Sequence, residues 1–381
     1  MTEPGCFRER TGPPARVVAA ETVDPRHTRR VAERVLTRRR LNRALLARQL
    51  LLDRAALTPA RAVERVGGLQ TQYAPSGYIG LWSRLAGFRR ADLTRALERR
   101  RIVQGWVMRC TIHMVSARDY VPLIEAVRAE RRRWWLRTHK ELAVVGMPAV
   151  AAAVRRHLAD GPRKQAQLVE LLAADGFPRE VFPGAQLWVD LVRVPPAGTW
   201  ERPRAHVYGL AEQWLPDGAA DRQAAEELLV TRYLRGFGPA SASSIARFCG
   251  FPVTATRAVL GRLELRRFRA ESGEELVDLP RAPLPDANTP APVRFLSTFD
   301  AVLLLGHARR AGIVPEEHRS KLFDPARPQS VPTFLVDGRV AGTWRWADDR
   351  VRWEPFDELA APVRRQVAEE AERLAAFHTD T

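Results

Sequence analysis

The chain has 381 residues, of which 45% are hydrophobic and 28% charged. It is therefore long enough to bury about two to four cores, and it cannot be disordered throughout. Its three cysteines, Cys6, Cys110 and Cys249, lie far apart, which excludes a disulfide framework and a cysteine-based zinc cluster. No apolar run reaches the ~18 residues of a membrane helix, and Glu3 and Arg8 precede any hydrophobic stretch. We therefore expect a cytoplasmic protein without membrane association.

The positive charge is concentrated in one stretch. The formal net charge is +17, and residues 38–140 alone contribute +16, from 23 basic and 7 acidic side chains. Arginine supplies it, because Lys140, Lys164 and Lys321 are the only lysines. Guanidinium groups suit phosphates and base edges, although a GC-rich genome also favours arginine and a basic face can simply be solvated. The distribution favours a nucleic-acid partner over a solvated surface.

The first part of the chain predicts a tail followed by helices and a strand pair. Residues 1–35 are expected to be a flexible tail, because most of this stretch is rich in Pro, Gly, Arg and Thr without apolar periodicity. Helical spacing begins at Leu41, Thr58-Pro59 starts a second helix, and Gly67-Gly68 ends it. The next expected elements are a helix at 91–101, two short strands or a strand and a turn within 102–115, and a long helix at 117–142. Helices followed by a strand pair predict a winged-helix unit over residues 36–145.

The same order of elements recurs twice, which predicts winged-helix units over 146–220 and 221–285. In the first repeat we expect helices at 148–158 and 165–174, a strand at 189–194, a turn at 195–198 and a return strand from Thr199. In the second we expect a helix–turn–helix around Ser244–Gly250, a helix at 254–263 and a hairpin of 265–270 with 275–279. The region 290–381 should add an antiparallel meander of 331–336, 339–346 and 351–356, and a helix at 362–377. The expected fold class is α+β, with tandem winged-helix domains and this C-terminal meander and helix.

Common catalytic signatures are missing from the sequence. There is no phosphate loop, no dinucleotide-binding Gly-x-Gly-x-x-Gly after a strand, no His-Glu-x-x-His and no Gly-x-Ser-x-Gly. We therefore expect no cofactor. His113, His307 and His318 lack the spacing of a ligand cluster, so they favour structural or DNA-facing roles and we expect no metal site.

Gln70-Thr71-Gln72 stands out, because it follows a helix end inside the most basic segment. If the tripeptide is extended, both amides lie on one side of the chain and face a common space, where they could hold one water. The alternative is structural, since glutamines at a helix end also bond backbone groups or solvent.

Several motifs together resemble the AlkZ-like family of DNA glycosylases, whose tandem winged helices unhook crosslinked DNA. The matching segments, in order, are 68–72 (GLQTQ), 81–85 (LWSRL), 108–115 (MRCTIHMV), 194–200 (VPPAGTW), 299–304 (FDAVLL) and 336–344 (VDGRVAGTW). The resemblance covers roughly residues 36–378. Thr71 stands where the family often has an aliphatic residue or alanine, and Cys110 where glycine is frequent.

The resemblance implies a catalytic pair and a substrate. The family's mechanism rests on a Gln-x-Gln or Gln-x-Asp motif, which falls on Gln70 and Gln72. Guanine alkylated at N7 is cationic and leaves without a strong general acid, so neutral amides suffice to place water and face the developing sugar cation. No lysine lies within residues 70–72, so a Schiff-base lyase step is not expected.

The partner expected from this reasoning is double-stranded DNA with alkylated purines, bound by a monomer. The candidate DNA-binding residues are Arg109, His113, Arg38, Arg39, Arg40 and Arg43. A non-catalytic winged-helix DNA-binding protein, such as a regulator or lesion sensor, remains the alternative, because binding needs only the basic surface. A small-molecule enzyme on a winged-helix scaffold is disfavoured by the missing cofactor motifs.

Overall fold

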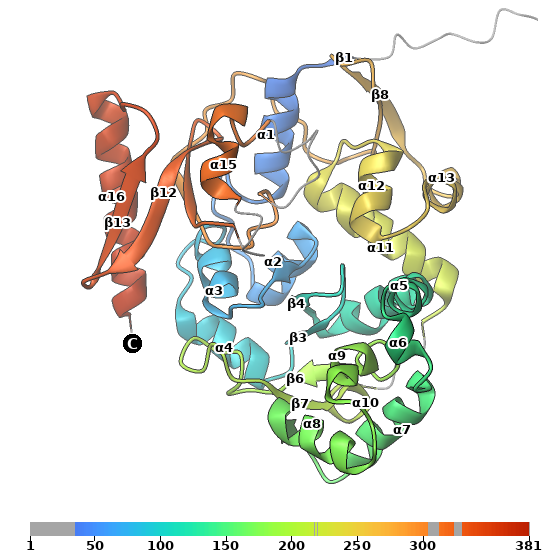
Figure 1. Cartoon of the computed structure of the whole chain (residues 1–381). Helices are drawn as coiled ribbons and strands as arrows, with labels where there is room; N and C mark the ends of the chain where they lie inside the picture. Colours follow the sequence, from blue (N-terminus) through green and yellow to red (C-terminus); the bar gives the residue numbers. More distant parts are fainter. Residues whose placement is uncertain (1–34, 217, 219, 304–311, 324–329, 381) are drawn as a thin grey trace, which may run out of the picture. The chain divides into compact units, whose positions relative to one another are not determined.

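Helices and short strands alternate along the computed structural model, which describes residues 35–216, 218, 220–303, 312–323 and 330–380 (Figure 1). The helices are α1 (Arg38–Arg48), α2 (Pro59–Val66), α3 (Pro75–Trp82), α4 (Arg90–Glu98), α5 (Ala117–Thr138), α6 (Lys140–Ala143), α7 (Met147–Leu158), α8 (Gln165–Ala174), α9 (Phe182–Ala185), α10 (Ala211–Trp214), α11 (Arg222–Phe237), α12 (Ala242–Cys249), α13 (Val253–Gly261), α15 (Arg319–Leu322) and α16 (Ala361–Thr379). The strands are β1 (Val35–Leu36), β2 (Leu69–Gln70), β3 (Ile102–Trp106), β4 (Ile112–Ser116), β5 (Arg163–Lys164), β6 (Leu191–Arg193), β7 (Val207–Leu210), β8 (Arg266–Ala270), β9 (Glu275–Asp278), β10 (Arg294–Leu296), β11 (Thr333–Val336), β12 (Arg339–Ala347) and β13 (Arg350–Pro355). Apart from Val35, the predicted tail lies outside the described residues.

The strands form three sheets in a mixed α+β fold. The largest has the order β2-β4-β3-β6-β7-β5 with antiparallel pairs throughout. It is continuous across the expected border between residues 145 and 146, so the first two expected units share one sheet. The C-terminal sheet has the order β10-β11-β12-β13, and β1 pairs in parallel with β8 beside β9. The division into winged-helix units stays a prediction.

Most predicted elements in the described part of the chain are present within a few residues of the expected bounds. The helix–turn–helix segment forms α12 and α13, and the hairpin after it forms β8 and β9. One expectation was wrong: the return strand β7 begins at Val207 and not at Thr199. The Arg193 guanidinium donates to the carbonyls of Pro203 and Ala205, and these bonds hold the intervening segment as a loop.

Local sequence explains how the chain enters the largest sheet. The Thr58 side chain caps α2 by accepting from the Arg61 backbone amide, and Gly67 ends the helix with φ +82°, a left-handed conformation that favours glycine. The chain then turns into β2. Helix α3 packs closely on this strand because Gly77 has no side chain: a Cβ there would lie 2.8 Å from the Thr71 methyl carbon.

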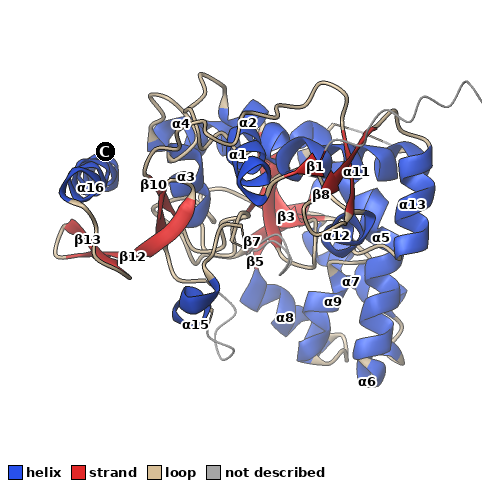
Figure 2. Cartoon of the chain, turned by 90° about the horizontal axis from the view of Figure 1, so that it is seen from above, coloured by secondary structure: helices blue, strands red, loops and turns tan. Residues whose placement is uncertain are grey.

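Two long helices pack on other elements of the fold. Helix α5 packs against α11, and the Arg232 guanidinium joins them by donating to Asp119 at 2.6 and 2.7 Å, with both side chains buried. Helix α16 lies against β13 at the C-terminal sheet (Figure 2). None of the described helices has the length and apolar character needed to cross a bilayer.

Candidate active site

The two glutamines lie at the edge strand of the largest sheet. Strand β2 pairs with β4 so that Gln70 is directly opposite His113. The Gln70 Nε2 donates to Gln72 Oε1 at 2.7 Å, so the two amides contact each other. Gln70 is 9% exposed, Thr71 is fully buried on the other side of the chain, and Gln72 is exposed. The exposed Gln72 is therefore held by the buried Gln70.

A tight turn between β3 and β4 brings Arg109 to the glutamines. Thr111 donates its backbone N–H to the Met108 carbonyl at 3.1 Å, and the two central residues, Arg109 and Cys110, have φ of +51° and +52°. Positive φ at both central positions is the pattern of a type I′ turn. These residues are not glycine, so the turn carries backbone strain of order 1 kcal/mol at each.

Arg109 connects the glutamine pair to a buried histidine. Its Nη2 donates to Gln70 Oε1 at 3.0 Å and lies 3.2 Å from His113 Nε2. The His113 Nδ1 lies 3.0 Å from the Thr111 carbonyl oxygen, which can only accept. His113 therefore carries its proton on Nδ1 and accepts from Arg109 through Nε2.

Burial and charge fix the protonation of this network. Burial, followed by the neighbouring Arg109 charge, lowers the pKa of His113 to about 3, so the ring is neutral at physiological pH. Burial lowers the pKa of Arg109 to about 10, which leaves the guanidinium charged. The Arg109 guanidinium also lies 5.1 Å from the centre of the ring of Phe248, a residue of α12. The charged donor fixes the Gln70 amide with its oxygen toward Arg109 and its NH₂ group toward Gln72.

The arrangement leaves one amide oxygen available for chemistry. Gln72 Oε1 accepts one bond from Gln70, and a carbonyl oxygen has a second lone pair. Gln72 is exposed, so this lone pair can accept from a water molecule at the surface. The pair can orient a water and face positive charge with a neutral dipole, but it cannot act as a strong base.

A cavity of 430 Å³ adjoins Arg109, and we call it the arginine cavity. Its charged lining residues are Arg109, Glu130, Arg131, Arg133, Arg137 and Arg247. Arg131 is buried and donates only to the carbonyls of Trp106 and Val107, which leaves its Nε and Nη2 without a partner among the described residues. Other buried arginines, such as Arg48 and Arg84, instead pair with aspartates. The cavity therefore has uncompensated positive charge.

Sequence reasoning missed Arg131, Arg137 and Arg247. Sequence signals existed for Arg137 and Arg247, but not for Arg131. Arg133 and Arg137 are four residues apart on the long predicted helix, so they share a face, and Arg247 lies within the helix–turn–helix segment next to the predicted turn.

The other predicted DNA-binding residues lie apart from the glutamines, on α1. The structure corrects the prediction that Arg43 binds DNA. Its side chain is fully buried, pairs with Asp337 and donates through Nε to the Thr289 carbonyl. A guanidinium held in this way stabilises the fold and has no face left for a phosphate. Arg39 also pairs with Asp337, at 2.8 Å, but remains half exposed.

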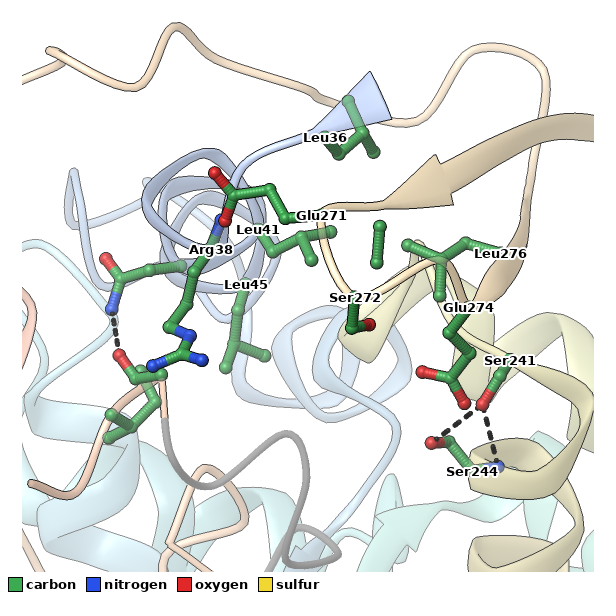
Figure 3. Close-up of a pocket in the computed structure, with 14 residues that line it drawn as sticks. Leu36, Arg38, Leu41, Leu45, Ser241, Ser244, Glu271, Ser272, Glu274 and Leu276 are labelled. Atoms are coloured by element: carbon green, nitrogen blue, oxygen red, sulfur yellow. Dashed lines mark hydrogen bonds between the residues drawn. The ribbon is translucent and has the colours of Figure 1, made fainter. Parts of the chain in front are cut away.

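Arg38 and Arg40 are the remaining arginines of α1. The Arg38 backbone N–H donates to Glu271 at 2.8 Å, and its exposed side chain borders a cavity of 330 Å³ between α1, α12 and the β8–β9 turn (Figure 3). Arg40 is half-buried. Among the described residues, neither arginine makes a hydrogen bond or ion pair with Gln70 or Gln72.

His318 contacts a residue outside the amide network. His318 is buried, and its Nε2 lies 2.9 Å from an Asp357 carboxylate oxygen, while His307 lies outside the described residues. Within those residues, no group of three or more His, Cys, Asp or Glu side chains is arranged to hold a metal ion. Cys110 and Cys249 are free thiols.

Comparisons with known proteins agree with each other. The family model for "DNA glycosylase AlkZ-like" matches residues 63–377. An interstrand DNA cross-link repair glycosylase of Streptomyces sahachiroi is 24% identical over 361 residues, which cover 87% of this chain and 93% of the relative. The solved structure of the Streptomyces sahachiroi DNA glycosylase AlkZ superimposes with a TM-score of 0.75 at 20% identity, covering 90% of this chain and 96% of that one. This structural likeness shows a shared fold.

Proposed function

Because this chain belongs to the AlkZ-like family of DNA glycosylases, we propose that it is a monofunctional glycosylase that hydrolyses the N-glycosidic bond of N7-alkylated purines in double-stranded DNA. The relative's name, which refers to interstrand cross-link repair, extends the proposed substrates to bulky adducts and crosslinks. The observation that carries the proposal is the contact between Gln70 and Gln72, fixed by Arg109.

The proposed chemistry suits a neutral amide pair. An N7-alkylated guanine carries a positive charge, so its bond to the sugar breaks without protonation by a general acid. The enzyme has to hold a water below C1′ and lower the energy of the cationic sugar. Gln72 Oε1 accepts from this water and turns its dipole toward the sugar, while Gln70 holds Gln72 in place. A buried carboxylate would bring a desolvation cost that an amide avoids.

Arginines provide the DNA contacts in this proposal. Tandem winged-helix units at 36–145, 146–220 and 221–285, followed by the C-terminal α+β region at 290–381, would bring a basic surface to the duplex. The arginine cavity next to Arg109 matches the charge of a backbone phosphate, and Arg38, Arg39 and Arg40 add broader contacts. His113 acts through Arg109 and does not itself contact DNA, since it is 2% exposed.

A second function fits the basic surface alone. The concentration of charge in residues 38–140 would also serve a non-catalytic DNA-binding protein, such as a regulator or lesion sensor. Such a protein needs the arginines and not the amide pair.

One assay separates the two functions. The protein is incubated with a duplex containing N7-methylguanine, and abasic sites are then cleaved with alkali. A glycosylase gives strand breaks well above the spontaneous background, and Gln72→Ala lowers them without loss of duplex binding. Tight binding with breaks at the background level would reject the enzyme and leave the DNA-binding protein.

A further inference from the structure

A cavity of 470 Å³ begins one residue beyond Gln72, and we call it the aromatic cavity. The residues that matter for its chemistry are Tyr73, Ser76, Trp200, Trp344, Trp346 and His378. Consecutive Cα atoms are ~3.8 Å apart, so the rim at Tyr73 is next to the exposed Gln72. A cavity of this size suits a small ring system.

The aromatic walls of the cavity are flat. The His378 ring stacks on Trp346, with centroids 4.3 Å apart and an angle of 9° between the planes. Trp200 meets His378 edge-on at 5.1 Å, and Trp344 does so at 6.1 Å. Burial lowers the pKa of His378 to about 4, with a further contribution from Arg90, so the ring is neutral at physiological pH. Such walls favour stacking and edge-to-face contacts with another aromatic ring.

Two polar atoms of the lining have no partner. Ser76 Oγ and His378 Nε2 are buried and make no hydrogen bond with any described residue. Ser76 is 4% exposed, at the first turn of α3. Leaving such buried polar atoms unpaired is unfavourable.

Arginines at the cavity disfavour a cationic occupant. The Arg204 guanidinium lies 5.6 Å from the Tyr73 ring and that of Arg90 lies 5.0 Å from the Trp200 ring. Arg345 lines the cavity as well, and no carboxylate does so among the described residues. These cations already use the aromatic faces that would attract another cation. The N7-alkylated guanine is itself cationic, so the lesion base fits this site less well than a neutral ring.

We propose that the aromatic cavity binds an uncharged aromatic arm carried by an N7-guanine adduct, and so selects bulky aromatic lesions over small alkyl groups. The inference rests on the proposed function, because it assigns the arm of the same substrate whose glycosidic bond meets Gln72. The arm stacks beside Trp346, while the cationic base stays outside the cavity near the amide pair.

Binding measurements test this without catalysis. The full chain carrying Gln70→Ala and Gln72→Ala is titrated with three duplexes that contain N7-benzylguanine, N7-cyclohexylmethylguanine or N7-methylguanine. We expect the benzyl duplex to bind about 10-fold more tightly than the methyl duplex, from aromatic stacking and ring burial. The cyclohexylmethyl duplex gains ring burial but no aromatic stacking, so it should bind at least about 3-fold more weakly than the benzyl duplex.

Variants identify the site. Adding Trp346→Ala should abolish the benzyl preference, and so should Ser76→Met, which fills the cavity. Trp353→Ala is the matched control, because Trp353 is a half-buried tryptophan of the neighbouring strand that does not line the cavity. Thermal melting verifies that each variant folds.

The outcomes separate the two proposals. Equal affinity for the benzyl and cyclohexylmethyl duplexes, or a benzyl preference that survives both Trp346→Ala and Ser76→Met, overturns the aromatic-arm site. Neither result depends on base release. Conversely, failure of the unmutated protein to release N7-methylguanine rejects the proposed function whatever the binding preference.

Discussion

The amides of Gln70 and Gln72 form one hydrogen-bonded unit whose two members have different surroundings. Gln70 is held by Arg109, while Gln72 is exposed and offers an unoccupied lone pair. Thr71 lies between them with its hydroxyl buried and without a partner among the described residues. Alternation along the chain thus separates two functional side chains from a packing one.

Replacing the glutamines should lower catalysis and leave binding intact. Gln70→Ala and Gln72→Ala should each reduce release of N7-methylguanine by about 10-fold or more, because the amides act mainly on the water and the sugar cation in the transition state. The double variant should lose little beyond the worse single variant, since the two amides work as a unit. Single-turnover rates and duplex affinity measure this.

Thr71→Val is the matched control for these variants. It keeps the shape of the side chain and removes only a hydroxyl that bonds to none of the described residues, so the release rate should not change. If both alanine variants release base at the parent rate while folded and bound, the pair is structural and the active site is elsewhere.

His113 should make the protein sensitive to acid. Its pKa is about 3 when folded, against ~6.5 in the unfolded chain. Below about pH 6.5 the unfolded chain therefore takes up a proton that the native state excludes, and the free energy of unfolding falls by about 1.4 kcal/mol per pH unit. His113→Gln preserves an acceptor for Arg109 and should remove this contribution. Denaturant unfolding at pH 7.5 and pH 5 measures the difference, and parallel pH dependence in both proteins would contradict it.

At the scale of elements, some motif residues prove to hold distant segments together. Arg84, at the end of α3, donates to both oxygens of Asp300 at 2.9 Å, with both side chains buried. Both belong to segments on which the family resemblance rests. Trp344, from another such segment, donates through its indole N–H to the Leu296 carbonyl. The resemblance of these segments therefore reflects the fold, and only part of it reflects chemistry.

Breaking the Arg84–Asp300 pair should destabilise the protein strongly. Asp300→Ala leaves a charged guanidinium buried, which costs about 3–5 kcal/mol. Arg84→Met with Asp300→Ala removes both charges and should recover much of the loss. Glu170→Ala is the control, since Glu170 pairs with Arg179 at the surface and its loss should leave the melting temperature unchanged. Similar melting temperatures for Asp300→Ala and Glu170→Ala would refute this role.

The sequence predicted where helices and strands lie better than it predicted which elements pair with each other. Gly67, Thr58-Pro59 and the spacing before Gly250 act within one turn of chain, so α2 and α12 were placed closely. Pairing over long distances left no such local signal: β1 joins β8 in parallel across more than two hundred residues. The glutamines were found by motif, whereas their link to Arg109 depends on the β2–β4 register and a type I′ turn without glycine. The contact between Arg109 and Gln70 could therefore not be predicted from the sequence.

At the scale of the whole molecule, the arginine excess is used in two ways. Arg43, Arg48, Arg84 and Arg232 are buried and paired with carboxylates, so part of the basic composition serves the fold. The arginine cavity does not follow this pattern, because two nitrogens of Arg131 have no partner in the part of the chain that the structure describes. The net charge therefore overstates the number of cations available to DNA. The salt dependence of binding can count the cations that contact DNA phosphates.

Affinity for duplex DNA should fall steeply with salt, and the arginine cavity should account for part of the slope. Each phosphate contact releases condensed counterions and contributes about 0.9 to the slope of log K against log salt. Arg137→Gln and Arg247→Gln remove two exposed cations that line the cavity, so each should lower the slope by about one unit. Arg179→Gln changes the net charge equally, but its guanidinium is paired with Glu170, and the slope should stay at the parent value. Equal slopes for all three variants would mean that the cavity holds no DNA phosphate, and a flat salt response of the parent protein would reject phosphate binding altogether.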